Sequence, residues 1–498
     1  MPNVSAIVWL TVGGLLSLFS KGGWTIAVAA WLAPVFLLHF ARLYNPVSGM
    51  TWLWLVLFVT TYLAYRGLIP APDLATVAIA ALIALAGLLP FLADRLIAPR
   101  IPGFLSTLVF PLAWAVVDFG AARLSPYGSW GSVAYSQYGI LPLMQLASVT
   151  GTAGIAFLIA WFASTLNWVW DRNFEWGAVR AGVLTYAIAW SAVMLLGGAR
   201  LTFSPMPQKT VRVAAIGWPE GAVTQPEFMR ALEPNLSSDE REKLRLAFQR
   251  IHDYFLDASR REARAGAKIV VWPEANAMVF HDDEGPFLDR AQQLAREETI
   301  NVLIGVGTVY PDIAQPFENK AVLVDPAGEV ALSYVKTIPV PGFEARISRR
   351  GSSPIPIRES IYGRIAVAIC FELDFPQFVR QVGAAQTDLF LVPASDWEAI
   401  KVLHHVSAVF RAVENGVSMV RATRWGLSAA VDPYGRVLAQ VDPFVLGQQA
   451  LVAQVPLNGV RTVFAAFGDW FGWLCLVGLI VLFTWSLLLA RARSGPRL

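Results

Sequence analysis

The chain has 498 residues, of which 55% are hydrophobic and only 15% are charged. That composition is too apolar for an ordinary soluble protein, and the length allows a membrane part together with a complete soluble domain. The net charge of +3 gives no argument for a nucleic-acid partner, and two cysteines exclude a disulfide scaffold. The five histidines show no zinc-binding spacing, so we expect no metal site.

Long apolar runs dominate residues 1–205, which we interpret as a membrane domain. Several runs are shorter than the roughly 20 residues that a span needs, so we expect the helices to extend into the flanking polar residues. The first run has no basic residue before it and no cleavage site after it, which favours a retained helix over a signal peptide. The seven candidate spans are 4–19, 25–41, 51–64, 74–92, 104–119, 152–170 and 179–196, and an eighth lies at 471–490 within a C-terminal segment, 461–498.

Arginines collect in the loops on one side of these spans and in the C-terminal tail. The set is Arg42, Arg95, Arg100, Arg172, Arg180, Arg491, Arg493 and Arg497, against Lys21, Arg66 and Arg123 on the other side. Because positively charged loops stay in the cytoplasm, we expect the part between the seventh and eighth spans to lie outside it. This predicts a multi-pass protein of the bacterial inner membrane whose soluble domain faces the periplasm.

The composition changes near Pro205, and residues 206–460 have the pattern of a globular domain with short apolar strands and charged helices. Two turns resemble each other, Asp325-Pro-Ala-Gly328 and Asp432-Pro-Tyr-Gly435, and each is flanked by strand-like runs. Proline fixes φ and glycine tolerates positive φ in such turns. The repeat suggests two similar halves around a sheet sandwich.

Cys370 ends the apolar run Ile365-Ala-Val-Ala-Ile-Cys370, which predicts a buried strand that delivers a thiol at its C-terminal end. The other cysteine, Cys475, lies in an apolar run near the C-terminus and is no evident disulfide partner. A lone buried cysteine is more often a small hydrophobic residue than a nucleophile. Two upstream runs favour a nucleophilic role for Cys370, since each ends in one ionisable residue. These residues are Glu274 after Val270-Val-Trp-Pro and Lys336 after Ser333-Tyr-Val.

A thiol is a good nucleophile only as the thiolate, so it needs a base or a cation nearby. Glu274 is a candidate base, because the apolar approach through Trp272 and Pro273 would raise the pKa of its carboxylate. Lys336 is a candidate for holding the oxyanion that forms when a thiol attacks an acyl carbonyl. The structural alternatives are that Glu274 caps a following helix and that Lys336 is an exposed strand end.

Glu, Lys and Cys in this order resemble the catalytic set of the nitrilase, or carbon–nitrogen hydrolase, superfamily. With its membrane helices, nearly the whole chain resembles the membrane-bound branch of that superfamily, the apolipoprotein N-acyltransferase family. The motifs that carry the resemblance are Ala134-Tyr-Ser-Gln137, Pro142-Leu-Met-Gln-Leu-Ala147, Gly151-x-x-Gly154, Val271-Trp-Pro-Glu274, Asn319-Lys-Ala321, Tyr334-Val-Lys336, Ile369-Cys-Phe-Glu372, Arg411-Ala-Val-Glu414, Val420-Arg-Ala-Thr423 and Phe467-Gly-Asp-Trp470. The resemblance implies an α+β fold in which about eight membrane helices accompany an α-β-β-α sandwich domain.

The resemblance also implies a function and the roles of the site residues. Glu274 is then the general base, Lys336 supports the oxyanion and Cys370 is the nucleophile, while Glu372 matches a further family carboxylate that orients the lysine or the acyl group. The implied reaction moves an acyl chain from a phospholipid to a thioester on Cys370, and from there to the amine of a diacylglyceryl-modified lipoprotein. No metal or organic cofactor is implied, and we expect a monomer with no nucleic-acid partner.

Three segments depart from the family pattern around the expected entrance to the substrate site. The sequence therefore does not identify the acceptor, the length of the acyl chain or the head group of the donor. Thr337-Ile-Pro-Val-Pro-Gly-Phe-Glu344 replaces Arg-x-Leu-Val-Pro-Phe-Gly-Glu, with Glu344 retained as a supporting candidate. Ser395-Asp-Trp397 and Thr423-Arg-Trp-Gly426 replace Asn-Asp-x-Trp-Phe and Thr-Asn-x-Gly. The prolines and glycines of 337–356 predict a mobile lid without regular elements.

Other functions remain as alternatives. The chain could be a membrane-bound amidase or acyltransferase of the same fold that acts on another amine or amide. A catalytically silent scaffold is disfavoured by the intact Glu274, Lys336 and Cys370, and a transporter by the lack of paired charges in the spans, where Asp118 is the only clear interior charge. We interpret His404 and His405 as packed side chains, and Arg411 and Glu414 as a structural ion pair.

Overall fold

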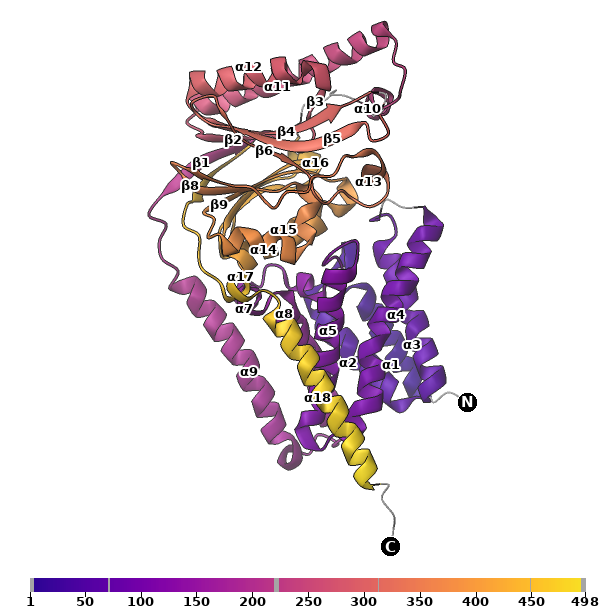
Figure 1. Cartoon of the computed structure of the whole chain (residues 1–498). Helices are drawn as coiled ribbons and strands as arrows, with labels where there is room; N and C mark the ends of the chain where they lie inside the picture. The colour runs from indigo at the N-terminus through magenta and orange to yellow at the C-terminus, as the bar shows by residue number, and fades with distance from the viewer. Residues whose placement is uncertain (1–3, 70–71, 219–223, 312, 448, 494–498) are drawn as a thin grey trace. The chain divides into compact units, whose positions relative to one another are not determined.

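The computed structural model describes residues 4–69, 72–218, 224–311, 313–447 and 449–493. The chain divides into two compact units, one formed by Met1–Ser204 with Phe467–Leu498 and the other by Pro205–Ala466. Figure 1 shows the first unit as helices and the second as sheets covered by helices. Each unit is described below by itself.

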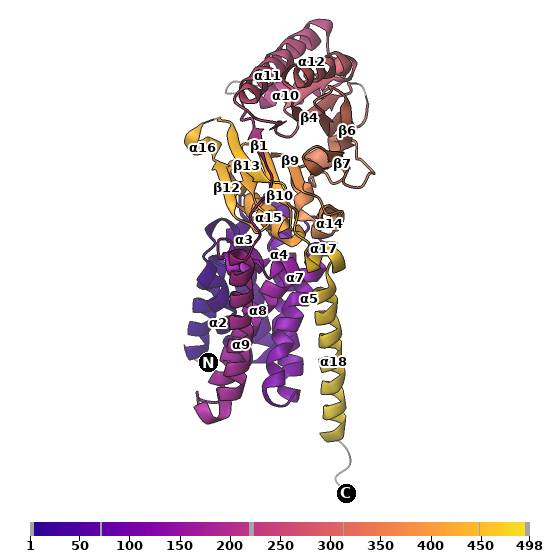
Figure 2. The same ribbon diagram turned by 90° about the vertical axis from the view of Figure 1, so that its left-hand side faces the viewer.

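The first unit consists mainly of apolar helices. Among the described residues, six helices are long and apolar enough to cross a membrane. Two shorter ones, α1 (Val4–Leu18) and α2 (Ala27–Leu43), pack against each other. The six are α3 (Pro46–Tyr65), α4 (Asp73–Ile97), α5 (Val109–Leu124) together with the 3-10 helix Gly103–Leu108 before it, α8 (Thr152–Trp170), α9 (Trp176–Thr202) and α18 (Trp470–Arg493). Together these helices, which run alongside one another in Figure 2, confirm the multi-span helical domain that the sequence predicts.

Four of the helices, α3, α4, α9 and α18, are longer than their apolar runs. The run at 51–64 lies within α3, which begins after Asn45, whose side chain accepts hydrogen bonds from the backbone N–H groups of Val47 and Ser48. Such capping satisfies N–H groups that have no partner inside the helix. The expectation that short spans extend into polar flanks is therefore confirmed for α3.

Two membrane helices carry a paired charge at their ends, just beyond the candidate spans 25–41 and 74–92. Arg42, in the last turn of α2, donates from Nε and Nη2 to the carboxylate of Asp94 in α4 at 2.9 Å each. The two residues lie 52 positions apart, so only the helix packing reveals the pair. Asp94 is 1% exposed and close to the C-terminal end of α4, which is consistent with a structural pair that joins two helix ends.

The second unit contains two sheets. The first has the order β13-β1-β2-β4-β5-β6, with β3 also paired to β4, and the second has the order β12-β11-β10-β9-β8-β7. The strands of the first are β1 (Thr210–Ala215), β2 (Ile269–Val271), β3 (Ala277–Phe280), β4 (Asn301–Val309), β5 (Phe317–Val324), β6 (Val330–Val335) and β13 (Leu451–Pro456). Those of the second are β7 (Ile357–Ser360), β8 (Gly363–Val367), β9 (Leu389–Ser395), β10 (Ser418–Arg424), β11 (Ser428–Val431) and β12 (Val437–Val441).

Two pairs of helices cover the outer faces of the sheets. Helices α11 (Ser238–Arg264) and α12 (Glu284–Glu298) contact the first sheet, and α14 (Pro376–Ala384) and α15 (Lys401–Asn415) lie against the second (Figure 1). Strands β1 and β4 of the first sheet contact β10 and β9 of the second. The layers are therefore α-β-β-α, as the family resemblance implies.

The two similar turns connect equivalent hairpins, one in each sheet. Asp325 joins β5 to β6 and its Oδ1 accepts from the backbone N–H of Ala327, whereas Asp432 joins β11 to β12 and accepts from Tyr434, both at 2.9 Å. The glycines that close the turns have φ of +79° at Gly328 and +82° at Gly435, where a Cβ would be strained. The turn chemistry read from the sequence is confirmed.

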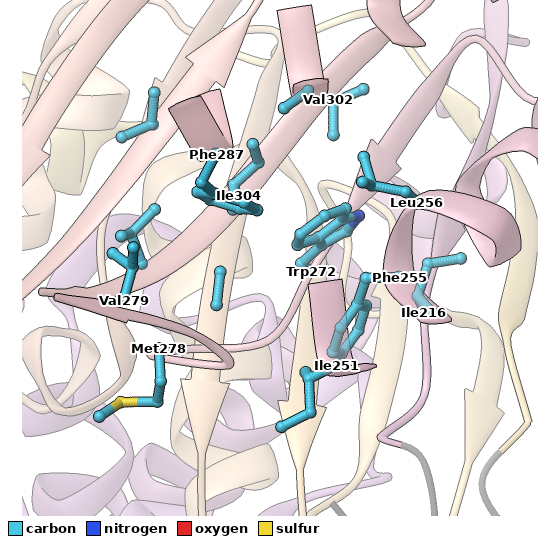
Figure 3. Packing of buried hydrophobic residues seen from close by; sticks show 14 of the residues in the cluster. Ile216, Ile251, Phe255, Leu256, Trp272, Met278, Val279, Phe287, Val302 and Ile304 are labelled. Carbon is cyan, nitrogen blue, oxygen red and sulfur yellow. The ribbon is translucent and has the colours of Figure 1, made fainter. Parts of the chain in front are cut away.

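An apolar cluster between α11 and the first sheet anchors the strand that leads to Glu274. Trp272 is fully buried and stacks on Phe255 of α11, with 4.8 Å between the ring centroids. Its indole Nε1 donates to Ser259 at 2.8 Å, which satisfies the one polar atom of the ring. Figure 3 shows this packing beside Ile304 and Phe287. Replacing a buried tryptophan by alanine typically costs about 3–5 kcal/mol, so this cluster stabilises the strand that leads to Glu274.

Candidate active site

Three strand ends bring Glu274, Lys336 and Cys370 into one buried region of the sandwich. Glu274 follows β2, Lys336 follows β6, and Cys370 begins the short 3-10 helix Cys370–Asp374 after β8. Their exposed fractions are 5%, 2% and 3%. The structural alternatives for the first two are wrong, because Glu274 precedes the strand β3 rather than a helix and Lys336 is not exposed.

Lys336 lies between two carboxylates. Its Nζ is 2.8 Å from Oε1 of Glu274 and 2.9 Å from both carboxylate oxygens of Glu344. The side-chain amide of Asn319 donates to the same two glutamates, at 2.7 Å and 2.9 Å. Burial lowers the pKa of Lys336, but the two neighbouring carboxylates outweigh it and hold that pKa well above its usual range. Lys336 is therefore a fixed positive charge in the site.

Glu344 lies on a regular element that the sequence does not predict. Residues Phe343–Ile347 form helix α13, so the expectation that 337–356 lacks regular structure is wrong. The segment is also fastened to its surroundings, because the backbone N–H of Gly351 donates to the carbonyl of Lys336 at 2.9 Å. Proline and glycine interrupt regular structure on either side of α13. The contacts of Glu344 hold the helix between them in place.

Cys370 has a backbone conformation that is uncommon for a residue with a side chain. Its φ is +49°, in the left-handed region, and such strain is frequent at functional sites. The Sγ atom lies 3.5 Å from the carbonyl oxygen of Ser395. Burial, followed by the carboxylate of Glu274, raises the pKa of the thiol, and the charge of Lys336 opposes this. The thiol is thus protonated at rest and needs a base to react.

Glu372 connects the two segments that carry Lys336 and Cys370. Its carboxylate accepts from the hydroxyl of Tyr334 and from the backbone N–H groups of Thr337 and Ile369, each at 2.7 Å. Thr337 follows Lys336 directly, and Ile369 precedes Cys370. Glu372 therefore joins the backbone segments that adjoin Lys336 and Cys370. Burial raises the pKa of Glu372 to about 7.

A buried charge cluster beside Cys370 was not predicted from the sequence. His404 Nδ1 is 2.7 Å from Asp396 and its Nε2 is 3.0 Å from Asp374, while Arg421 also donates to Asp396 at 2.7 Å. One ligand atom each of Cys370, Asp396 and His404 lies within 4.8 Å of the others. Burial lowers the pKa of His404, but the two carboxylates raise it to about 9 overall.

The cluster has the composition of an ion-pair network. Both ring nitrogens of His404 face carboxylates, and the guanidinium of Arg421 already neutralises part of their charge. The expectation that His404 and His405 are packed side chains is confirmed, since both are at most 3% exposed. The expected pair of Arg411 and Glu414 is confirmed as well, at 3.0 Å.

Two family models match the chain. Residues 241–464 match the carbon-nitrogen hydrolase model, and residues 12–165 match the model of the apolipoprotein N-acyltransferase N-terminal domain. An apolipoprotein N-acyltransferase of Geobacter metallireducens is 28% identical over 505 residues, which cover 96% of this chain and 91% of that one. The Pseudomonas aeruginosa protein of the same name is 27% identical over 78% of this chain and 75% of its own.

Among solved structures, an amidase from Nesterenkonia sp. is similar to this chain. It shares 22% sequence identity, covers 51% of this chain and 94% of its own, and gives a TM-score of 0.40.

Proposed function

The chain belongs to the apolipoprotein N-acyltransferase family, and we propose that Glu274, Lys336 and Cys370 are its catalytic residues. They transfer an acyl chain from a phospholipid, through a thioester on Cys370, to the N-terminal amine of a diacylglyceryl-modified lipoprotein. The observation that carries this proposal is the convergence of three buried strand ends, with Lys336 only 2.8 Å from Glu274 beside the thiol.

The first half-reaction acylates the enzyme. Glu274 takes the proton of the Cys370 thiol, and Sγ attacks the ester carbonyl carbon of the phospholipid. Lys336 stabilises the negative charge that develops on the carbonyl oxygen. The bond between the carbonyl carbon and the glycerol oxygen then breaks, and Glu274 returns its proton to that oxygen. The products are a lysophospholipid and the Cys370 thioester.

The second half-reaction restores the thiol. The neutral amine of the lipoprotein attacks the thioester carbonyl, again with Lys336 beside the developing oxyanion. Glu274 takes a proton from the attacking nitrogen, the carbon–sulfur bond breaks, and the proton passes to the sulfur. Glu344 and Glu372 act as positioning residues, because each holds Lys336 or the segment next to it.

This membrane protein would act in the bacterial inner membrane with its catalytic unit on the periplasmic side. The arginine-rich loops support that orientation, since positive loops remain in the cytoplasm. Its substrates are lipids or lipid-anchored, so catalysis by a monomer in the bilayer is sufficient and no nucleic acid is involved.

A transfer assay with the full-length protein tests the proposal. The purified protein is incubated in detergent with phospholipid and a synthetic peptide that carries an N-terminal S-diacylglyceryl cysteine, and the acylated peptide is measured by mass spectrometry. Glu274→Gln, Lys336→Met and Cys370→Ala should each reduce transfer by about 10³-fold or more. The same peptide with a blocked N-terminus is the control and should receive no acyl chain.

Acylation of a small amine or hydrolysis of an amide, without acylation of the lipopeptide, would instead favour the alternative of an amidase or acyltransferase with another substrate. Retention of full transfer by any of the three variants would contradict the assigned role of that residue.

A further inference from the structure

Arg424 stands where the family pattern has an asparagine, and the structure places it one strand away from the catalytic thiol. It is the last residue of β10 and pairs in register with Ser395 of the parallel strand β9. The carbonyl of Ser395 is the group that lies 3.5 Å from Sγ of Cys370. Strands β8, β9 and β10 are parallel, and adjacent strands are about 4.8 Å apart. Arg424 and the thiol therefore lie at the same, C-terminal, end of these strands.

Two indole rings hold the guanidinium of Arg424. Its Cζ is 4.1 Å from the ring centroid of Trp218 and 4.0 Å from that of Trp425. Trp218 is 4% exposed, whereas Trp425 is 40% exposed and has a φ of +50°. Cation–π contacts occupy the face of a guanidinium and leave the N–H groups at its edge available for hydrogen bonds.

Those N–H groups lack a counterion in the described part of the chain. The Nε atom is buried without a hydrogen-bond partner, and no described carboxylate forms a hydrogen bond with the guanidinium. Burial lowers the pKa of Arg424 to about 10, opposed only by the more distant charge of Glu274. Arg424 is only partly buried, but its buried Nε donor without a partner carries a cost that an anionic ligand removes.

A phosphodiester is the anion that fits this position. Arginine presents a planar fork of donors that matches phosphate oxygens bidentately. In the proposed reaction the phospholipid donor carries a phosphate close to the ester that Cys370 attacks, whereas the diacylglyceryl group and amine of the acceptor carry none. A positive charge at this end of the strands therefore attracts the donor but not the acceptor.

We propose that Arg424, stacked on Trp218 and Trp425, binds the phosphodiester of the glycerophospholipid donor and thereby places its ester at Cys370. This inference rests on the proposed function and adds a residue that determines donor specificity. It also explains why an aromatic pair flanks the arginine: the rings restrict the side chain, so that less conformational entropy is lost on binding.

The test compares two donors that differ in the phosphate group. Full-length protein in one detergent receives dioleoyl phosphatidylethanolamine or dioleoylglycerol, and the rate of Cys370 acylation is measured against donor concentration. Arg424→Gln should raise the half-saturating concentration of the phospholipid by about 10- to 100-fold, the value of a charge-assisted hydrogen bond. Acylation by dioleoylglycerol should not change, and Arg424→Lys should recover part of the loss. Arg358→Gln, which alters an exposed arginine of β7, is the matched control.

Three results would overturn the inference. Equal losses with both donors would give Arg424 a purely structural role, and unchanged saturation by the phospholipid would remove it from donor binding. Binding of inorganic phosphate that depends on Arg424, with unchanged lipid saturation, would assign the position to free phosphate.

A binding measurement separates this inference from the proposed function. If wild-type protein forms no thioester with either donor, the proposed function is contradicted. Equilibrium binding of the same two lipids to Cys370→Ala protein, with and without Arg424→Gln, then still tests whether Arg424 recognises the phosphate.

Discussion

Both carboxylate oxygens of Glu344 accept hydrogen bonds from Nζ of Lys336, each at 2.9 Å. One of these oxygens also accepts from the backbone N–H of Val340 at 2.7 Å, so the segment after Lys336 folds back onto the lysine itself. Any opening of this segment would remove one counterion of Lys336. The position of the segment and the electrostatics of the site are therefore linked.

Glu344→Gln should slow acylation of Cys370 by about 10²-fold, because small displacements of a catalytic group have effects of that size. The free energy of unfolding should stay close to that of the wild-type protein, since Glu274 still pairs with Lys336. Stopped-time mass spectrometry of the thioester measures the rate. Glu329→Gln alters an exposed glutamate and serves as the control. A wild-type rate in Glu344→Gln would remove Glu344 from the mechanism.

Asp396→Asn should make the Cys370 thiol more acidic. Asp396 raises the pKa of Cys370 and Arg421 lowers it, so loss of the carboxylate leaves the arginine to favour the thiolate. The pH midpoint for alkylation of Cys370 by iodoacetamide should therefore move downward. Asp289→Asn, an exposed aspartate, should leave the midpoint unchanged. An unchanged midpoint in Asp396→Asn, or an upward shift, would contradict this effect of Asp396 on the thiol.

Glu372 should make stability depend on pH. Its pKa rises from 4.5 to about 7 in the folded protein, so the folded state keeps a proton that the unfolded state has lost. The stabilisation is present below pH 4.5 and is lost as the pH rises through about 7. The thermal unfolding midpoint of the full chain should thus fall across this window, and fall less in Glu372→Gln. Equal slopes for both proteins would contradict the assignment.

Reporter fusions test the proposed orientation. Helix α9 ends at Thr202, so a phosphatase fused after Pro205 should be active if the catalytic unit faces the periplasm. Fusions after Arg172, between α8 and α9, and after Leu498 should be inactive. The reverse pattern would place the catalytic unit in the cytoplasm.

Local sequence patterns predicted those features of the molecule that are determined by residues close together in the sequence. Apolar runs located the membrane helices, and Glu274, Lys336 and Cys370 stood out because each ends such a run. The charge cluster of His404 depends on carboxylates 8 and 30 positions away, which only the folded sheet and α15 bring together. Glu344 was predicted only as a supporting candidate, because its contacts with Lys336 and Asn319 are tertiary and cannot be read from the sequence.

The most direct test of the account is the intact mass of the detergent-purified protein after incubation with phospholipid alone. We predict a mass increase of one acyl chain, located on the peptide that contains Cys370, removed by neutral hydroxylamine and missing in Cys370→Ala. An adduct that persists in Cys370→Ala, or wild-type protein that acylates the lipopeptide without ever forming the adduct, would contradict the thioester mechanism.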